Sequence, residues 1–386
     1  MHKDLPIWMS WPSVRRLFDV FSKENTPLFA VGGSVRDAIL GLGPKDVDFA
    51  TAAAPDQTIA ILQTAGIRAV PTGIDHGTVT AVIDGMSHEI TTFRADIETD
   101  GRHATVVFTK DRQIDALRRD FTMNALYMGS DGQIYDDAGG IEDAQAGRLR
   151  FIGDPSARLA EDYLRMLRFF RFSARFSKTA PDAAALEAIA QAAQGLARVS
   201  AERIGSEIVQ LFETAAPLSA VQLMQDAGVA AVIFDQTDIA RLTRAIALER
   251  VLDRPPHAMM RLAVYSQDHL KDRLRLSNAQ AKEIEAIQNL RTAPVAPVEL
   301  GHDWPAPLSG DGLIAMRAFE DRDVSDQDLL DLKFGQDSSC PITAKDFAGF
   351  YQGPALGAAL KKAKRLWLQS KGTMSIDTIR ERLHHD

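Results

Sequence analysis

Two carboxylates at the start of an apolar run are the residues most suited to chemistry. Asp46 and Asp48 flank Val47 in the stretch PKDVDFATAA, residues 44–53. If this stretch enters a strand, alternate side chains share one face, so the two carboxylates project side by side, about 6–7 Å apart at the backbone. Adjacent carboxylates repel each other unless a cation lies between them. The pair is therefore either a solvent-screened surface feature or a metal site.

A two-metal site for phosphoryl transfer is the functional interpretation of this pair, with ions about 3.5–4 Å apart. One ion would lower the pKa of an attacking hydroxyl, and the other would hold a triphosphate and its leaving group. Such a site often includes a carboxylate from a neighbouring strand, and Glu89 in HEITTFR is the candidate. Glu89 could equally be a solvated strand residue.

A pair of glycines precedes the aspartates in VGGSVRDAIL, residues 31–40, which predicts a strand, a tight turn and a helix. Gly32 and Gly33 would let the backbone approach a ligand closely, and the helix N-terminus would offer free N–H groups to an anion. Arg36 could add a charged hydrogen bond to a phosphate. A plain strand–turn–helix connection fits the same letters, but the nearby carboxylate pair favours nucleotide binding.

Two further segments carry more charge than packing requires. We expect IDALRRDFTMNALYM, residues 114–128, to form one packed helix that contains Arg119. We also expect SARLAEDYLRMLRFFRFSARF, residues 156–176, to be a single amphipathic helix with polar residues on one face. That face would carry Asp162, Arg165, Arg168 and Arg171. The alternative for both segments is a solvated helix surface with local ion pairs.

An aspartate and an arginine fixed side by side could select nucleobases. Cytosine and adenine both present a ring-nitrogen acceptor beside an amino donor, whereas uracil and guanine present the reverse. A carboxylate accepts and a guanidinium donates, so the pair Asp162 and Arg165 would match C and A. The wrong base would leave buried polar groups unpaired, at about 1–3 kcal/mol per group.

The surrounding pattern predicts an α+β class, with a head of mixed sheet and helices followed by an all-α region. Residues 78–94 should form a hairpin around the turn Asp84-Gly85. Residues 97–113 are polar and glycine-bearing, so we expect a flexible loop. From about residue 154 the periodicity is almost wholly helical. The proline-rich stretch 291–307 is typical of a linker or an extended crossing.

Composition sets the remaining bounds. The chain has 386 residues, which predicts two or more domains, and it is 45% hydrophobic and 25% charged, as is typical of a globular protein. Cys340 is the only cysteine, the first residues do not resemble a signal peptide, and no apolar run is long enough to span a membrane. We therefore expect a cytoplasmic protein. The net charge of −8 argues against a surface coated with nucleic acid but allows local basic strips.

Taken together, four ordered motifs resemble those of the bacterial class II tRNA nucleotidyltransferases, or CCA-adding enzymes, which are related to bacterial poly(A) polymerases in the DNA polymerase beta superfamily. The motifs are VGGSVRDAILG with KDVDFAT, HGTVT with HEITTFR, RRDFTMNAL, and AEDYLRMLRFFRF. The resemblance is dense over residues 28–175. It implies a nucleotidyltransferase head over residues 1–150, a helical neck with a nucleotide-templating helix over 151–215, and a tRNA-binding helical body and tail over 216–386.

The resemblance also implies roles for individual residues. Asp46 and Asp48 match metal-binding carboxylates, with Mg²⁺ as the expected ion. Asp162 and Arg165 match the pair that templates the base. The residues that match nucleotide contacts are Gly33, Arg36, Arg119, Arg168 and Arg171.

The implied reaction is addition of C, C and A to the 3′ end of tRNA from CTP and ATP, with release of pyrophosphate. The alternatives are a poly(A) polymerase, a partial CC- or A-adding enzyme, and an RNA-binding protein without catalysis. The motif TGIDHGTVT resembles the CCA-adding branch more closely than the poly(A) polymerases. The intact aspartate pair argues against a protein that has lost its chemistry.

Overall fold

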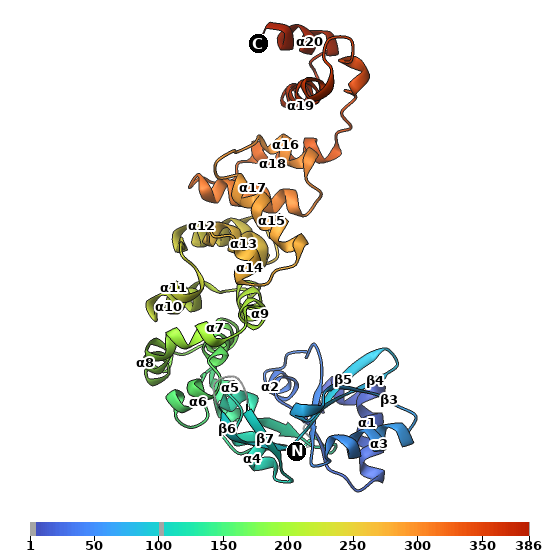
Figure 1. Cartoon of the computed structure of the whole chain (residues 1–386), viewed down its shortest axis with the longest axis vertical. Helices are drawn as coiled ribbons and strands as arrows, with labels where there is room; N and C mark the ends of the chain where they lie inside the picture. Colours follow the sequence, from blue (N-terminus) through green and yellow to red (C-terminus); the bar gives the residue numbers. More distant parts are fainter. Residues whose placement is uncertain (1–4, 100–103, 386) are drawn as a thin grey trace. The chain divides into compact units, whose positions relative to one another are not determined.

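The computed structural model describes residues 5–99 and 104–385, and the chain divides into two compact units. The first unit comprises Met1–Glu207 with Ser219–Ile233, and the second comprises Ile208–Leu218 with Phe234–Asp386. The first unit contains a mixed sheet with helices, and the second is helical (Figure 1). The α+β class and the change to helices along the chain are as the sequence predicts.

Seven strands within the described residues form the main sheet, in the order β3-β4-β5-β2-β1-β8-β9. The pairing between β2 and β5 is parallel, and the other neighbours are antiparallel. A core of aliphatic and aromatic side chains joins this sheet to α1 (Pro12–Lys23) and α3 (Pro55–Thr64). The strands are β1 (Leu28–Val31), β2 (Asp48–Thr51), β3 (Arg68–Gly73), β4 (Thr78–Ile83), β5 (Met86–Thr92), β8 (Leu126–Met128) and β9 (Ile134–Asp136).

The predicted hairpin is confirmed. Strands β4 and β5 pair from Thr78 opposite Thr91 to Ile83 opposite Met86. The two connecting residues, Asp84 and Gly85, both have positive φ, at 50° and 81°. A two-residue turn with two positive φ values matches the right-handed twist of the flanking strands, and aspartate followed by glycine suits it.

Residues 114–128 do not form the single helix that we expected. Helix α4 (Arg112–Leu117) ends before the arginines, the 3-10 turn η3 (Thr122–Asn124) follows, and the chain then enters strand β8. The reason is tertiary, because β8 pairs with β1 and so supplies the hydrogen bonds that β1 needs on that side. Helical spacing of apolar residues could not reveal this pairing.

The expected loop over residues 97–113 is also corrected. Strands β6 (Arg94–Thr99) and β7 (Ala104–Phe108) form a two-stranded antiparallel sheet, here called the β6–β7 ribbon. Residues 100–103 between them lie outside the described residues. The segment ATVVF in β7 is rich in residues that favour strands, and pairing within the ribbon satisfies its backbone without the main sheet.

The expected long helix over residues 156–176 is two helices. Helix α6 (Pro155–Glu161) ends at Asp162, whose φ of −154° and ψ of 104° are extended, and α7 (Leu164–Phe176) follows. The Asp162 side chain accepts a hydrogen bond from the Leu164 backbone N–H at 3.0 Å. Asp162 therefore does not share a helical face with the arginines of α7. It stands at the corner where the two helices meet.

The remaining helices complete both units. Gly301 and Gly335 let α16 and α18 pack backbone against backbone, since a Cβ on Gly301 would lie 2.0 Å from the Leu332 carbonyl oxygen. The proline-rich stretch 291–307 therefore contains a packed helix, and the expected linker was wrong. The bounds of the helices are α2 (Gly33–Ile39), α5 (Gly140–Ala146), α8 (Ala183–Ala192), η4 (Ala193–Arg198), α9 (Ala201–Phe212), α10 (Leu218–Asp226), α11 (Val229–Ile233), α12 (Ile239–Val251), α13 (Ala258–Tyr265), α14 (Leu270–Arg273), α15 (Asn278–Asn289), α16 (Pro297–Asp303), α17 (Leu308–Phe319), α18 (Asp326–Asp337), α19 (Gly353–Gln369) and α20 (Ile376–His385).

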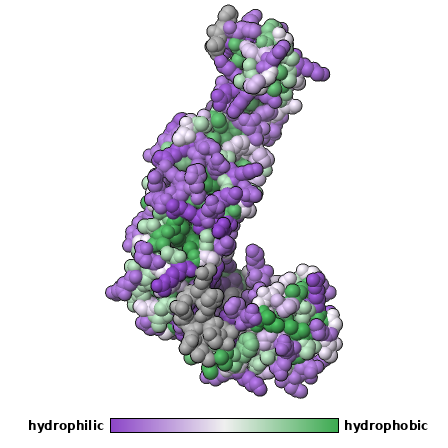
Figure 2. Space-filling view, in the orientation of Figure 1, coloured by the Kyte–Doolittle hydropathy of each residue, from purple (hydrophilic) through white to green (hydrophobic). Residues whose placement is uncertain are grey.

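The surface of the helical unit is largely hydrophilic on the face shown in Figure 2. Within the part of the chain that the structure describes, no helix combines the length and the apolar character needed to cross a membrane.

Gly140 should be essential for the position of η3. A Cβ at this residue would lie 2.1 Å from the Thr122 backbone carbonyl oxygen. We therefore expect Gly140→Ala to lower the free energy of unfolding by about 1–3 kcal/mol through overpacking, as measured by urea denaturation. The control is Gly43→Ala, because a Cβ at Gly43 meets nothing within 4 Å and its φ is not positive. Equal stability of the two variants would contradict this account.

Candidate active site

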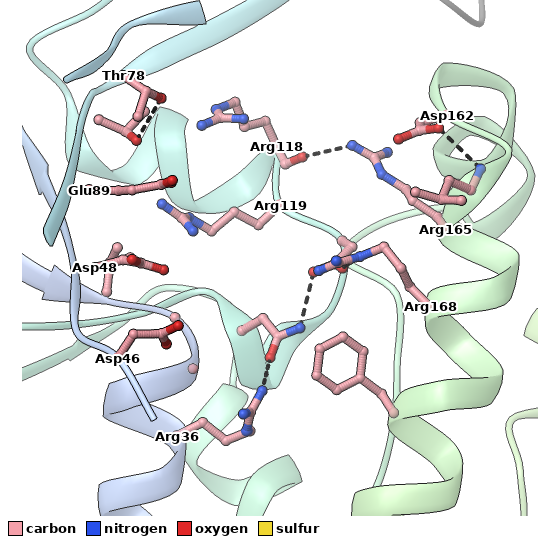
Figure 3. A pocket seen from close by; sticks show the side chains of 18 of the residues that line it. Arg36, Asp46, Asp48, Thr78, Glu89, Arg118, Arg119, Asp162, Arg165 and Arg168 are labelled. Atoms are coloured by element: carbon pink, nitrogen blue, oxygen red, sulfur yellow. Dashed lines mark hydrogen bonds and ion pairs between the residues drawn. The ribbon is translucent and has the colours of Figure 1, made fainter. Parts of the chain in front are cut away.

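A pocket of about 700 Å³ in the first unit collects the predicted site residues. They arrive from the turn after β1, from β2 and β5, from the segment between α4 and β8, and from the α6–α7 corner with α7 itself. Figure 3 shows the carboxylates on one side of this pocket and the α7 arginines on the other. Among the residues lining the pocket are Gly32, Gly33, Arg36, Asp46, Asp48, Glu89, Arg119, Asp162, Arg165, Arg168 and Arg171.

Three carboxylates point into one side of the pocket (Figure 3). Asp46 and Asp48 are exposed and Val47 between them is buried, so the predicted alternation holds, although β2 begins only at Asp48. Phe49 of β2 is the register partner of Ile90 of β5 in the parallel pair. Asp48 and Glu89 precede these partners, so they lie side by side on the same face of the sheet.

The carboxylate cluster is not neutralised within the protein. The pKa of Asp48 is raised to about 6, because desolvation by the surrounding pocket and repulsion from Asp46 and Glu89 outweigh the attraction to Arg119. In the described residues none of the three carboxylates forms an ion pair or accepts a side-chain hydrogen bond. Uncompensated neighbouring carboxylates are the environment that a divalent cation stabilises.

The donor set fits a hard cation that also takes ligands from a substrate. Among residues 5–99 and 104–385, no group of three or more histidine, cysteine, aspartate or glutamate side chains forms a complete metal site. Mg²⁺ is usually bound by one or two carboxylates, with water and substrate phosphates as the other ligands. Asp46 and Asp48 meet that requirement, and Glu89 adds negative charge beside them.

The glycine turn forms the floor next to the carboxylates. Gly32 has φ 72° and ψ −121°, a conformation that L side chains rarely adopt, and Gly33 begins α2. A Cβ on Gly32 would lie 3.8 Å from Nη1 of Arg119. The Arg119 guanidinium therefore lies against the turn, and in Figure 3 it points toward Asp48 and Glu89.

Arg36 is more deeply buried than the sequence suggested, with 4% of its surface exposed. Its guanidinium pairs with Asp37 at 2.7 Å, donates to Oδ1 of Asn124 at 2.6 Å, and lies 4.1 Å from the centre of the Phe176 ring. Burial lowers its pKa, although Asp37 opposes the effect. Arg36 lines the pocket and also braces α2 against η3 and α7, so its contact with a nucleotide stays a prediction.

Two arginines of α7 are held by carboxylates from two other segments. Arg168 Nε donates to Asp120 at 2.7 Å, and Arg171 Nε donates to Glu207 of α9 at 2.5 Å. Burial alone would raise the pKa of Asp120, but Arg168 and the donors Phe121 N–H and Asn124 lower it overall. Asp120 lies in the segment 114–128, which carries more charge than packing requires. The sequence did not mark Glu207, because only the packing of α9 against α7 brings it there.

The predicted templating pair lies at the α6–α7 corner. Oδ2 of Asp162 pairs with Nη2 of Arg203 at 2.6 Å, while its Oδ1 caps α7. Arg165 donates to Glu161, to the Arg158 carbonyl at 2.9 Å and to the Arg118 carbonyl at 3.3 Å. Sequence reasoning did not single out Arg203. Arg203 and Glu207 are four residues apart and so lie on one face of α9, but only the packing of distant segments gives them their partners.

Family descriptions match two parts of the chain. Residues 28–150 match the poly A polymerase head domain, and residues 180–253 match a probable RNA and SrmB-binding site of polymerase A. The mitochondrial CCA tRNA nucleotidyltransferase 1 of Mus musculus is 44% identical over 220 residues, which are 56% of this chain and 51% of that protein. The CCA-adding enzyme of Leuconostoc mesenteroides is 40% identical over 186 residues, which are 48% of this chain and 45% of that protein.

Solved structures match over almost the whole chain. The Bacillus stearothermophilus CCA-adding enzyme in complex with CTP has a TM-score of 0.76 at 25% identity and covers 97% of this chain and 98% of its own. The chain belongs to the family of class II tRNA nucleotidyltransferases and poly(A) polymerases. A second structure, the Thermotoga maritima CCA-adding enzyme with tRNA, has a TM-score of 0.70 at 19% identity and covers 98% of this chain and 96% of its own.

The curated relatives named above match this family member over about half of its length. The chain spans about half the length of the curated relatives that it matches. Members of the family generally use a divalent metal. The carboxylate cluster at the start of β2 is the part of this pocket suited to a divalent metal.

Asp48 should destabilise the metal-free protein once it is ionised. Because its pKa is raised from 3.8 to about 6, the folded state holds the proton more tightly, and stability falls as pH rises through about 6. We expect Asp48→Asn to melt at a higher temperature than the parent at pH 8 in EDTA, and at nearly the same temperature at pH 4. Adding Mg²⁺ at pH 8 should raise the melting temperature of the parent alone.

The control is Asp84→Asn in the exposed β4–β5 turn, which removes a carboxylate that lies outside the pocket. A stabilisation by Asp48→Asn that does not change between pH 4 and pH 8 would contradict the charge-repulsion account.

Proposed function

We propose that the protein adds C, C and A to the 3′ end of tRNA without a nucleic-acid template, using CTP and ATP and releasing pyrophosphate. The observation that carries the proposal is one pocket that joins an uncompensated carboxylate cluster to the Asp162–Arg165 corner. The relatives named as CCA-adding enzymes, and the related structures with CTP, ATP and tRNA, support it.

In this proposal the 3′-terminal hydroxyl of tRNA attacks the α-phosphorus of the nucleotide. A new oxygen–phosphorus bond forms, the bond to the β-phosphate oxygen breaks, pyrophosphate leaves and the hydroxyl proton is released. Mg²⁺, when bound by Asp46 and Asp48, would supply the charge that favours the ionised hydroxyl and the leaving pyrophosphate. Glu89 would add a third negative charge beside the bound Mg²⁺. The chain needs no nucleophile of its own.

Binding of the triphosphate would use the other charge in the pocket. Arg119 lies against the Gly32–Gly33 turn and faces the carboxylates, so a phosphate between them would meet a guanidinium on one side and metal on the other. Arg168 and Arg171 would extend the positive surface toward the nucleotide, each held in place by a carboxylate.

Base selection would depend on the α6–α7 corner. Asp162 offers a fixed acceptor, because capping α7 and pairing with Arg203 restrict its rotation. Arg165 offers a donor from the first turn of α7, held by Glu161 and two backbone carbonyls. The two residues lie on either side of the helix start, and this corner replaces the single helical face that the sequence suggested.

The proposal also assigns a function to each region of the chain. Residues 1–150 would form the catalytic head, residues 151–215 the neck that selects the base, and residues 216–386 the body and tail that bind tRNA. On α19, Arg365 is paired with Glu299 at 2.8 Å. Exposed Lys361 is therefore a better candidate for a phosphate contact on that helix.

A poly(A) polymerase is the second candidate, because the matched family descriptions name polymerase A. A partial CC- or A-adding enzyme is the third. Incubation of tRNA lacking its 3′ CCA with labelled CTP and ATP separates the three. Incorporation of two C residues followed by one A supports the proposal, whereas repeated A addition or a stop after CC supports an alternative.

Removing either metal-binding carboxylate should stop the chemistry but not RNA binding. We expect Asp46→Asn or Asp48→Asn to lower incorporation of both nucleotides by about three orders of magnitude, because several kcal/mol of charge stabilisation are lost. Binding of tRNA, measured by filter binding, should change little. Near-normal turnover of either variant in Mg²⁺ would exclude the metal assignment.

Altering Asp162 should change the choice of base as well as the rate. Asp162→Ala removes the acceptor for the amino group that C and A share, so discrimination against UTP and GTP should fall roughly ten- to a hundredfold. Incorporation of each of the four triphosphates measures this change.

Asp154→Ala is the matched control, because Asp154 caps α6 through Ala157 N–H at 2.8 Å and does not line the pocket. The control should lose stability but keep its preference for C and A. The templating role is wrong if folded Asp162→Ala rejects UTP and GTP as strongly as the parent does.

A further inference from the structure

One buried carboxylate, Asp115 in α4, contacts four groups around the pocket. Its exposure is 1%, and it does not line the pocket itself. Its Oδ1 accepts from Arg118 Nε at 2.8 Å and from the Arg94 backbone N–H at 3.3 Å. Its Oδ2 accepts from Arg119 Nη2 at 3.0 Å and from the Tyr127 hydroxyl. A residue that the sequence did not mark thus connects two pocket arginines with the start of the β6–β7 ribbon.

The geometry fixes each arginine while leaving one nitrogen available. Arg119 uses Nη2 for Asp115 and Nε for the Tyr127 hydroxyl, at 2.9 Å. Its Nη1 makes no hydrogen bond to the described residues and lies against Gly32 at the pocket floor. Arg118 likewise presents Nε and Nη2 to Asp115, at 2.8 and 2.7 Å. Asp115, which does not line the pocket, therefore fixes the orientation of both guanidinium groups.

The charge balance supports a role toward an anion. Asp115 remains ionised, because Arg119 and Arg118 lower its pKa to about 2 against the effect of burial. One carboxylate faces two guanidinium groups, so one positive charge in this cluster is not compensated by it. Burial raises the pKa of Tyr127, whose neutral hydroxyl both donates to Asp115 and accepts from Arg119. The excess positive charge lies at the pocket wall that both arginines line.

We propose that Asp115 is a positioning residue for the triphosphate of the nucleotide: it orients Arg118 and Arg119 so that their remaining nitrogens face the phosphates. This inference rests on the proposed function for the identity of the ligand, and its own content is the anchoring of the two arginines. A fixed guanidinium loses less conformational entropy when it binds a phosphate than a free one does. Loss of the anchor should therefore weaken phosphate binding more than it slows the chemical step.

The chain offers a matched control. Asp143 is also fully buried, pairs with Arg148 and Arg150 at 2.8 Å each, and accepts from a hydroxyl, that of Thr122, at 2.6 Å. Neither Arg148 nor Arg150 lines the pocket. Asp115→Asn and Asp143→Asn therefore remove the same charge from similar surroundings, and only the first should affect phosphate binding.

The experiment measures binding of CTP and of inorganic pyrophosphate by calorimetry on the full chain, together with kcat and KM for CTP on tRNA lacking CCA. We expect Asp115→Asn to raise the Kd of both ligands, and KM, about tenfold or more, with a smaller change in kcat. Asp143→Asn should lose comparable thermal stability with unchanged Kd and KM. Tyr127→Phe keeps the Asp115 carboxylate but removes one of its hydrogen bonds, so its Kd should lie between those of the parent and Asp115→Asn. This variant replaces Asp115→Asn in the test if Asp115→Asn does not fold.

The proposal is overturned if Asp115→Asn, or Tyr127→Phe in its place, binds pyrophosphate and CTP as the parent does, or if Asp143→Asn weakens them equally. It is also overturned if the parent binds neither ligand. If the parent binds CTP but does not extend tRNA, the proposed function fails, and the Kd comparison still decides the role of Asp115.

Discussion

Electrostatic repulsion at the start of β2 is the constraint around which the pocket is built. Asp46, Asp48 and Glu89 are close enough that the pKa of Asp48 is raised, and the protein supplies no ion pair for them within the described residues. The arrangement exists because β2 pairs in parallel with β5 and so places Asp48 beside Glu89. A fold does not gain stability from such a cluster, which indicates that it is maintained for a ligand.

The opposite wall follows the reverse rule, because its arginines pair with carboxylates, some of which are shared between two arginines. Arg168 pairs with Asp120, Arg171 with Glu207, and Arg36 with Asp37. Partly buried guanidinium groups that lacked partners would carry a large desolvation penalty. Pairing keeps the arginines fixed and charged. Their side chains therefore stay on this wall and do not form ion pairs with the carboxylates on the other side of the pocket. The pocket is thus open for an anion accompanied by cations.

The corner at Asp162 is where the proposed base selection would meet this charge pattern. A continuous helix would have placed the aspartate one turn before Arg165 and free to rotate. The break gives it an extended backbone and uses one of its oxygens to cap α7, while Arg203 holds the other. The same residue therefore begins the helix and presents an acceptor to the pocket. Helix geometry and base recognition would then depend on the same side chain.

The sequence by itself determined the local features whose cause is local. Alternation predicted the side-by-side aspartates, aspartate followed by glycine predicted the β4–β5 turn, and paired glycines predicted the turn before α2. Each depends on backbone preferences or on the two-residue period of a strand, which a few neighbouring letters specify. The sequence also identified most of the charged residues that the pocket collects, although it missed Arg203.

Only the tertiary structure decided which partners these residues have. The expected helix over residues 114–128 is replaced in part by a turn and strand β8, because β8 pairs with β1. The expected loop is the β6–β7 ribbon, because its two halves pair with each other. Asp115 and Glu207 acquired their arginines through packing of distant segments. Hydrogen bonds and ion pairs between residues far apart in the chain leave no periodic signal, so no local pattern could have specified them.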